Sequence, residues 1–373
     1  MSTCIFPAEA RLADPKFAQR IARDFTARRI ATGTTAAMVF GSAFGHAQDA
    51  LFTETARVGL RLVSGRGIQT VGPDSAEPLL TSEADAIALT RAEIERWHGA
   101  DTGDPSTSLL HTAIVPRFTL SVTTQTLRAL GELYAEVADT GVYVHTHLNE
   151  NNRPGTGEID SVKQLFEVDT YLDTYDGKFL PGSAHGGESL LGRRTILAHA
   201  VHCTDAELDR MAQTGTSIAH CPTSQLFLGS GTMPWRRTVG SGVTVAAGSD
   251  CGAGDEWLIS RVLSDAFKVH ISEPGDAGVS IHPAQLLFTG TLAARELSTR
   301  GSVRQPRRRQ GGRLPGHRAV AMAAAGSGPC ERDSGRRRDL AREQELFALL
   351  MALREPAIAE VYVRGQRVSP DEG

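Results

Sequence analysis

The sequence has no long apolar run and no disulfide framework, and its opening residues do not show the pattern of a leader. No apolar run reaches the roughly 18–20 residues that a membrane-spanning helix needs, so no membrane span is predicted. The opening residues, MSTCIFPAEARLADP, have neither a basic head nor an apolar core, and we expect no signal peptide. The five cysteines form no CxxC pair. These absences favour a reducing compartment, and the predicted location is cytoplasmic.

Basic charge is concentrated in a single segment. The 373 residues carry a formal net charge of −4, and residues 300–342 hold twelve arginines against three acidic residues, a local charge of +9. The rest of the chain therefore carries −13, which opposes binding to nucleic acid, and we expect no nucleic-acid partner. The sequence also lacks an HxE…PCxxC signature, so a zinc deaminase of the cytidine type is not favoured.

The body of the chain alternates helical and strand-like segments. Residues 16–298 follow the pattern of a parallel sheet with crossover helices. The pattern predicts a helix over 82–97 that begins after Ser82, and a capping box of Thr204 with Glu207 that opens a later helix. A surface excursion is expected at residues 171–188. Seven strands can be counted of the eight that a (β/α)8 barrel needs, and we expect the missing one to precede the first residue.

Three units are predicted along the chain. Residues 1–299 form an α/β domain, a TIM-like (β/α)8 barrel that lacks its first strand. Residues 300–342 have almost no apolar periodicity and resemble an irregular, basic linker. Apolar order returns in residues 343–373, where a helix and an edge strand of a hairpin are expected.

Histidines and an aspartate close three of the predicted strands. His147 lies in the motif HTHLNENN, His199 ends an apolar run further along the chain, and Asp250 follows a third run in Gly-Ser-Asp. Strand ends of a barrel share one face, so these side chains are expected to converge. Neutral imidazole and carboxylate suit zinc, and an open coordination position leaves room for a water molecule. The chemistry indicated is hydrolysis.

Seven motifs in the body of the chain carry a family resemblance, and together they resemble the guanine deaminases of the amidohydrolase superfamily. The motifs are IFPAE, GTTAA, PRFTLS, HTHLNEN, LAHAVH, SIAHCPTS and GSD. Near the C-terminus, AEVYVRGQRV matches the strand that closes the small β-sandwich domain of such proteins. The resemblance covers residues 5–299 and 345–366. It implies a barrel of the metal-dependent hydrolase type with a remnant of that β-sandwich, one zinc ion per subunit, a purine substrate and a homodimer.

The resemblance also implies a role for each matching residue. His147 corresponds to the metal ligand of the fifth strand and Asp250 to that of the eighth. His199 corresponds to the sixth-strand histidine that hydrogen-bonds the reacting water, and it is a third candidate ligand. Glu150 corresponds to the substrate-binding acid that shuttles a proton to the purine ring. Asp250 would take the proton of the attacking water, and ammonia would leave.

The substrate pocket implied by the resemblance contains Arg117 and Phe118. The guanidinium of Arg117 would offer a rigid fork of donors to the purine carbonyl, and adenine would leave those donors unpaired. The alternative for Arg117 is an ion pair with an acidic neighbour. The function implied is zinc-dependent hydrolysis of guanine to xanthine and ammonia, in purine catabolism or salvage.

The sequence departs from the family pattern at three places. The first-strand HxH, which supplies two further zinc ligands, is absent from this chain. His145 and His147 imitate it, but the NENN that follows assigns them to the fifth strand and leaves His145 as a neighbour of the site. Residues 300–342 replace an apolar return to the β domain, which a reading-frame slip in the source sequence would explain. Gln225 stands where the family usually shows asparagine.

Three other interpretations stay open at this point. The chain could be an aminohydrolase of the same superfamily that acts on a pterin, cytosine or a triazine, with the pocket reused. It could also be a catalytically incomplete fragment of a guanine deaminase, since two ligands and one strand are missing. A nucleic-acid binder with a basic tail is the least favoured, because the acidic body opposes it. Structural roles are expected for four other residues: His202, His220, Cys221 and Cys251.

Overall fold

A parallel sheet forms the centre of the protein. The computed structural model describes residues 4–153, 157–179, 186–291, 293 and 334–369. Within these residues the main strands pair as parallel neighbours in chain order, β1-β2-β4-β5-β6-β7-β8. Their bounds are β1 Ala36–Phe40, β2 Arg61–Gly65, β4 Leu110–Pro116, β5 Tyr143–Leu148, β6 Thr195–His199, β7 Ser217–His220 and β8 Thr244–Ala247. The short β3 (Gly67–Ile68) pairs with β4 beside β2.

The connectivity is that of a TIM-like α/β fold. Each strand is followed by a connection that returns the chain to the next parallel strand, and β1 and β8 stand at the two ends of the order. The predicted TIM-like α/β architecture is therefore confirmed, and the seven main strands in the described part of the chain form an open half-barrel. The absence of a first strand stays a prediction. No helix in the described residues is long and apolar enough to cross a membrane.

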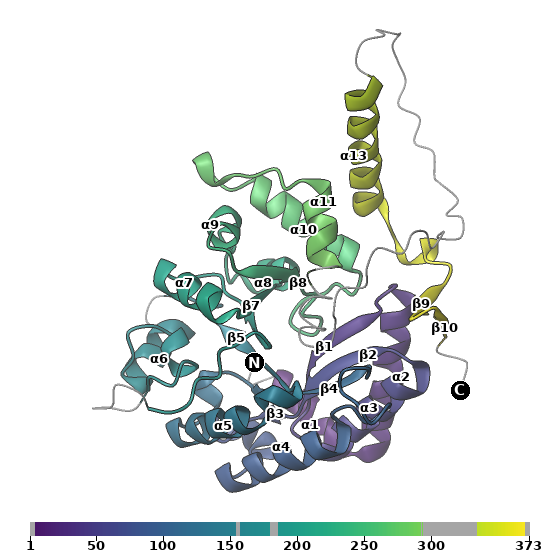
Figure 1. Ribbon diagram of the computed structural model, residues 1–373. Coiled ribbons are helices and arrows are strands. Elements are labelled where there is room, and N and C mark those ends of the chain that lie inside the picture. Colours follow the sequence, from purple (N-terminus) through teal and green to yellow (C-terminus); the bar gives the residue numbers. More distant parts are fainter. Residues whose placement is uncertain (1–3, 154–156, 180–185, 292, 294–333, 370–373) are drawn as a thin grey trace.

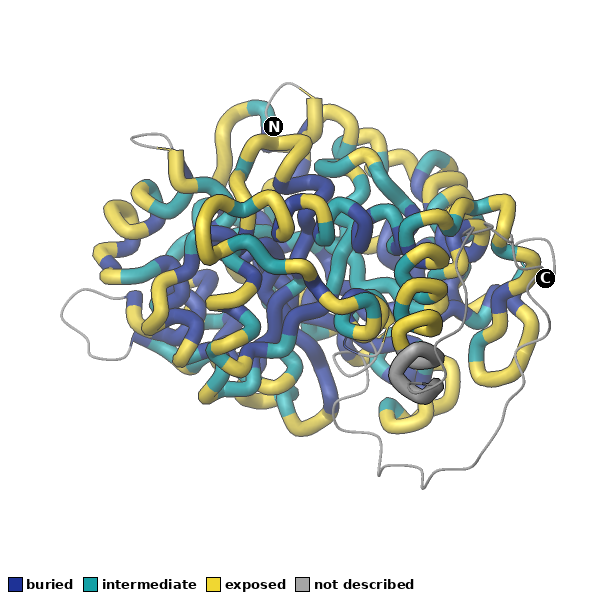
Figure 2. Tube along the Cα trace, turned by 90° about the horizontal axis from the view of Figure 1, so that it is seen from above, coloured by how far each residue is buried: buried dark blue, intermediate teal, exposed yellow. Residues whose placement is uncertain are grey.

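Helices cover the outside of the strand layer (Figure 1). Their bounds are α1 Ile5–Ala10, α2 Pro15–Ala31, α3 Gly45–Val58, α4 Glu83–Trp97, α5 Thr124–Val137, α6 Glu158–Phe166, α7 Asp205–Thr214, α8 Pro222–Leu228, α9 Trp235–Gly240, α10 Ile259–Ile271, α11 Pro283–Gly290 and α13 Ser334–Ala352. Buried segments run through the middle of the molecule and the exposed ones form the outer turns of the helices (Figure 2).

Two helix starts follow the sequence signals. Ser82 Oγ accepts the N–H of Asp85 at 3.1 Å at the start of α4. Thr204 and Glu207 form a reciprocal capping box at the start of α7. Both predictions are confirmed. A side-chain oxygen at these positions accepts the N–H of a residue in the first turn, which has no partner inside the helix.

The expected surface excursion at residues 171–188 is wrong for its first part. The side chains of Tyr171 and Tyr175 are 0% and 1% exposed and belong to the main hydrophobic core with Phe166 and Leu172. The hydroxyl of Tyr175 donates a hydrogen bond to the carbonyl of His147 at 3.0 Å. Burial of the two aromatic rings explains why the chain runs through the core here. The polar residues between the two rings are the reason for the wrong prediction. Residues 180–185 lie outside the described residues.

Helix α13 corrects the predicted end of the irregular segment. It begins at Ser334 rather than at residue 343, because the stretch RRRDLAREQE consists mostly of strong helix formers. The ring of Phe347 lies edge-on against that of Phe267 in α10, with centroids 4.8 Å apart. The remainder of the segment, up to residue 333, lies outside the described residues.

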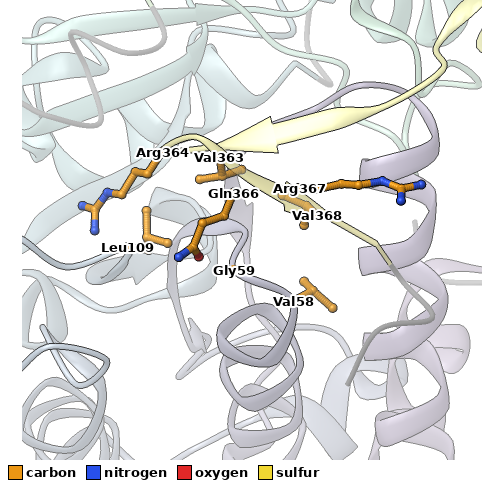
Figure 3. Close-up of a pocket in the computed structure, with 8 residues that line it drawn as sticks. All are labelled: Val58, Gly59, Leu109, Val363, Arg364, Gln366, Arg367 and Val368. Atoms are coloured by element: carbon orange, nitrogen blue, oxygen red, sulfur yellow. The ribbon is translucent and has the colours of Figure 1, made fainter.

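The expected C-terminal hairpin is present and covers the amino-terminal ends of the strands. β9 (Val361–Val363) pairs antiparallel with β10 (Gln366–Val368), and the pair packs on Ile30, Val58 and Leu60. A cavity of about 240 Å³ lies beneath it, and its lining includes residues that precede β2 and β4 (Figure 3). This cavity is therefore at the opposite end of the sheet from the carboxyl ends of the strands.

Candidate active site

Four predicted site residues meet at the carboxyl ends of the strands. β5 and β6 pair in register, with Leu148 opposite His199, and the rings of His147 and His199 stack at 5.3 Å. His199 Nε2 lies 3.6 Å from Glu150 Oε2 and 4.0 Å from Asp250 Oδ2. The predicted convergence of His147, His199 and Asp250 is what the structure has, and Glu150 lies beside them.

The backbone at these positions is strained. His199 has a φ of 73° and Asp250 a φ of 46°. Left-handed conformations of residues other than glycine cost free energy and gather at functional sites, where the surrounding fold holds them. Gln225 contributes here, since its Nε2 donates to the carbonyl of His199 at 3.4 Å. The residue that departs from the family pattern therefore supports the end of β6.

Both histidines are neutral at physiological pH. Burial lowers the pKa of His147 to about 4, helped by the neighbouring His199 ring, and burial alone lowers the pKa of His199 to about 4. Nδ1 of the neutral His147 donates to the carbonyl of Arg117 at 2.7 Å. Its Nε2 therefore carries a lone pair, as a metal-binding imidazole requires.

The two carboxylates oppose each other electrostatically. Burial raises the pKa of Asp250 to about 6, and the negative charge of Glu150 adds to the rise while a hydrogen bond from Ser224 opposes it. Ser230 Oγ donates to Glu150 Oε1 at 2.8 Å. Two carboxylates whose charges repel each other favour a nearby cation or protonation of one of them.

Arg117 contacts the site through its backbone and an acidic neighbour through its side chain. Its Nη1 lies 2.5 Å from Glu9 Oε2, within the IFPAE motif, and its guanidinium lies over the ring of Phe6 at 5.1 Å. The alternative of an ion pair is therefore present in the structure. Phe118 follows it, partly exposed, with its N–H donated to Ser121 Oγ at 3.1 Å.

The remaining histidines take supporting positions. His145 is buried, and its ring stacks on Phe40 with centroids 3.8 Å apart. His220 Nε2 lies 3.0 Å from His270 Nε2, and His202 Nε2 donates to the carbonyl of Ser230 at 2.9 Å. These contacts agree with the structural roles expected for His202 and His220.

The donor types at the site suit a divalent metal, although the described residues do not complete a metal centre. Among them, no group of three or more His, Cys, Asp or Glu side chains is arranged to hold a metal ion. His147 Nε2 and the Asp250 carboxylate are the candidate ligands, with His199 as a third. A neutral imidazole can donate a lone pair to a dication. The positive charge of the dication would offset the repulsion between the two carboxylates.

The fold is a TIM-like α/β fold with histidine and carboxylate side chains gathered at the carboxyl ends of its strands. Residues 2–297 match the model of the Amidohydrolase family, and the chain belongs to this family. It is 40% identical over 301 residues to a probable guanine deaminase of Deinococcus radiodurans, covering 80% of this chain and 62% of that protein. It is 34% identical over 265 residues to the guanine deaminase of Escherichia coli, covering 71% of this chain and 55% of that protein. The chain thus spans less than two thirds of the length of either relative.

Two solved structures are similar to this chain in fold. The structure of E. coli guanine deaminase matches with a TM-score of 0.75 at 29% identity, covering 97% of this chain and 77% of that chain. An atrazine chlorohydrolase of Arthrobacter aurescens TC1 complexed with zinc matches with a TM-score of 0.64 at 21% identity, covering 77% of this chain and 61% of that chain. The second match shows a shared fold alone.

Proposed function

We propose that this protein is a guanine deaminase that hydrolyses guanine to xanthine and ammonia with the help of one zinc ion. The observation that carries the proposal is the convergence of His147, Glu150, His199 and Asp250 at the carboxyl ends of β5, β6 and β8. The identity of 40% with a probable guanine deaminase supports guanine as the substrate. The same fold supports many different reactions, so the proposed reaction has to be argued from the site residues.

The residues that would hold zinc are His147 and Asp250, with His199 as the further candidate. His147 already donates its Nδ1–H to a backbone carbonyl, an arrangement that orients the ring and leaves Nε2 for the metal. A zinc ion there would supply Lewis acidity that activates a water molecule near neutral pH. The zinc content of the purified protein, compared with that of His147→Ala, tests this part of the proposal.

The carboxylates would move the protons. Asp250 would accept a proton from the attacking water. Glu150, fixed by Ser230, would deliver a proton to a ring nitrogen of guanine. Neutral His199 would hydrogen-bond the reacting oxygen.

Arg117 and Phe118 would recognise the purine. A guanidinium has five N–H donors, and the ion pair with Glu9 uses only some of them. The others would be free to meet the carbonyl oxygen of guanine. The partly exposed ring of Phe118 would lie beside the base.

The test is ammonia release from guanine by the purified chain supplied with zinc. Glu150→Gln should lower kcat by about 10²–10⁴-fold, since it removes the general acid. Glu95→Gln, an exposed glutamate on α4, is the matched control and should leave kcat unchanged. Faster turnover of a pterin, cytosine or a triazine would overturn guanine as the substrate. No turnover of any of them would favour an incomplete fragment.

A further inference from the structure

The loop after β5 is held by hydrogen bonds on both sides of Glu150. Asn149 leaves the strand with a φ of 49°, its Nδ2 donates to Glu207 Oε1 at 2.9 Å, and its carbonyl accepts the N–H of His202 at 3.1 Å. The N–H of Glu150 itself donates to Glu158 Oε1 at 2.9 Å. The backbone of Glu150 is therefore fixed from two directions.

Glu158 is a costly residue at this position. It is the first residue of α6, it is partly buried, and its carboxyl also accepts the N–H of Asn151. Burial raises the pKa of Glu158 to about 7, the hydrogen bond from the Glu150 N–H opposes the rise, and the negative charge of Glu150 adds to it. A carboxyl so close to a second one is electrostatically unfavourable. Two backbone N–H groups that it satisfies explain its presence.

The hydrogen bond from the Glu150 N–H to Glu158 also fixes where the Glu150 side chain starts. Its Oε1 accepts Ser230 Oγ–H at 2.8 Å, and its Oε2 lies 3.6 Å from His199 Nε2. Both distances depend on where the main chain places the Cα of Glu150. Without an acceptor on α6, that N–H loses its partner and the loop is free to turn away from His199.

We propose that Glu158 is a positioning residue, whose carboxyl oxygen holds the backbone of Glu150 so that the Glu150 carboxylate faces the reacting atoms. The inference rests on the proposed function of Glu150 as the proton shuttle. What matters is an acceptor oxygen, not a negative charge, because the partner is a neutral N–H group. Glutamine at this position would therefore do the same work, and alanine would not.

The variants Glu158→Ala, Glu158→Gln and Asp160→Ala separate this role from helix stabilisation. Asp160 is exposed in the same first turn of α6, so its loss removes a similar charge from the helix N-terminus and serves as the control. Glu158→Ala should lower the kcat for guanine about tenfold to a hundredfold, the range expected for a misplaced catalytic group, with KM little changed. Glu158→Gln and Asp160→Ala should stay within about threefold of the unmodified chain. Equal losses in both Glu158 variants, or an unchanged kcat in Glu158→Ala, would overturn the proposal.

Amide hydrogen exchange provides a readout that does not need turnover. Exchange at the N–H of Glu150, followed by mass spectrometry, should accelerate in Glu158→Ala and stay slow in Glu158→Gln and Asp160→Ala. Unchanged exchange in Glu158→Ala would overturn the hold of Glu158 on the loop, whatever the activity. If the unmodified chain does not deaminate guanine, the proposed function fails, and the exchange rates still decide whether Glu158 fixes Glu150.

Discussion

Replacing Asn149 with alanine should destabilise the protein by about 3 kcal/mol, through two separable effects. Asn149 is 1% exposed and donates its Nδ2–H to the carboxyl of Glu207, which is 3% exposed. Glu207 Oε1 keeps the N–H of Leu172 at 3.2 Å, so the cost is that of one lost hydrogen bond to a charged group, about 1.5–3 kcal/mol. Alanine at a φ near 49° adds about 1 kcal/mol of backbone strain, which asparagine tolerates better.

Asn149→Gly separates the two effects. Glycine removes the hydrogen bond to Glu207 and adopts the left-handed conformation without strain, so it should cost about 2 kcal/mol. Asn152→Ala, an exposed asparagine in the same loop, is the control and should stay within about 0.5 kcal/mol of the unmodified protein. Urea unfolding at equilibrium with linear extrapolation measures each free energy. The reasoning is refuted if Asn149→Ala costs no more than Asn152→Ala, or if glycine costs more than alanine.

Three further perturbations test other parts of the structure. Burial raises the pKa of Glu93 from 4.5 to about 7, so its ionisation costs folding free energy that is absent below pH 4.5, grows between pH 4.5 and about 7, and stays constant above that. Glu93→Gln, with Glu95→Gln as its exposed control, should therefore gain up to about 3 kcal/mol relative to the unmodified protein between pH 5 and pH 8, and a flat difference in urea unfolding would contradict this. Arg117→Lys should raise the KM for guanine about tenfold in steady-state assays, because lysine lacks the planar fork, and an unchanged KM would argue that Arg117 serves only Glu9. Phe52→Ala should cost about 3–5 kcal/mol in thermal unfolding, since its ring is 0% exposed and stacks on Trp97 at 5.2 Å, and a cost below about 1 kcal/mol would contradict that packing.

Local sequence signals correctly predicted the main strands, two helix starts and the edge of the sheet at which the strands end. Apolar runs of strand length placed the sheet, and the capping residues Ser82 and Thr204 placed two helix starts. Because parallel strands align their carboxyl ends, the positions of His147, His199 and Asp250 in the sequence were enough to predict that they meet. These predictions depend on short stretches of chain. They also use the general rule that crossover connections between parallel strands are right-handed.

The contacts that tune the site were decided only by the tertiary structure. Ser230 reaches Glu150 across 80 residues of sequence and Glu9 reaches Arg117 across 108, and neither serine nor glutamate has a local pattern that marks such a role. Glu158 is only eight residues from Glu150, and its carboxyl turns back to accept the N–H of Glu150. Glu158 stands in none of the motifs identified in the sequence.

The sequence by itself thus determined the α/β architecture and the meeting of His147, His199 and Asp250 at one end of the sheet. The burial of Tyr171 and Tyr175, the ion pair of Arg117 and the hydrogen bonds that fix Glu150 depended on packing between segments far apart in the chain. The physical reason is that periodicity and capping are properties of neighbouring residues. Burial, pKa and the choice of a hydrogen-bond partner are properties of the space that the whole fold encloses.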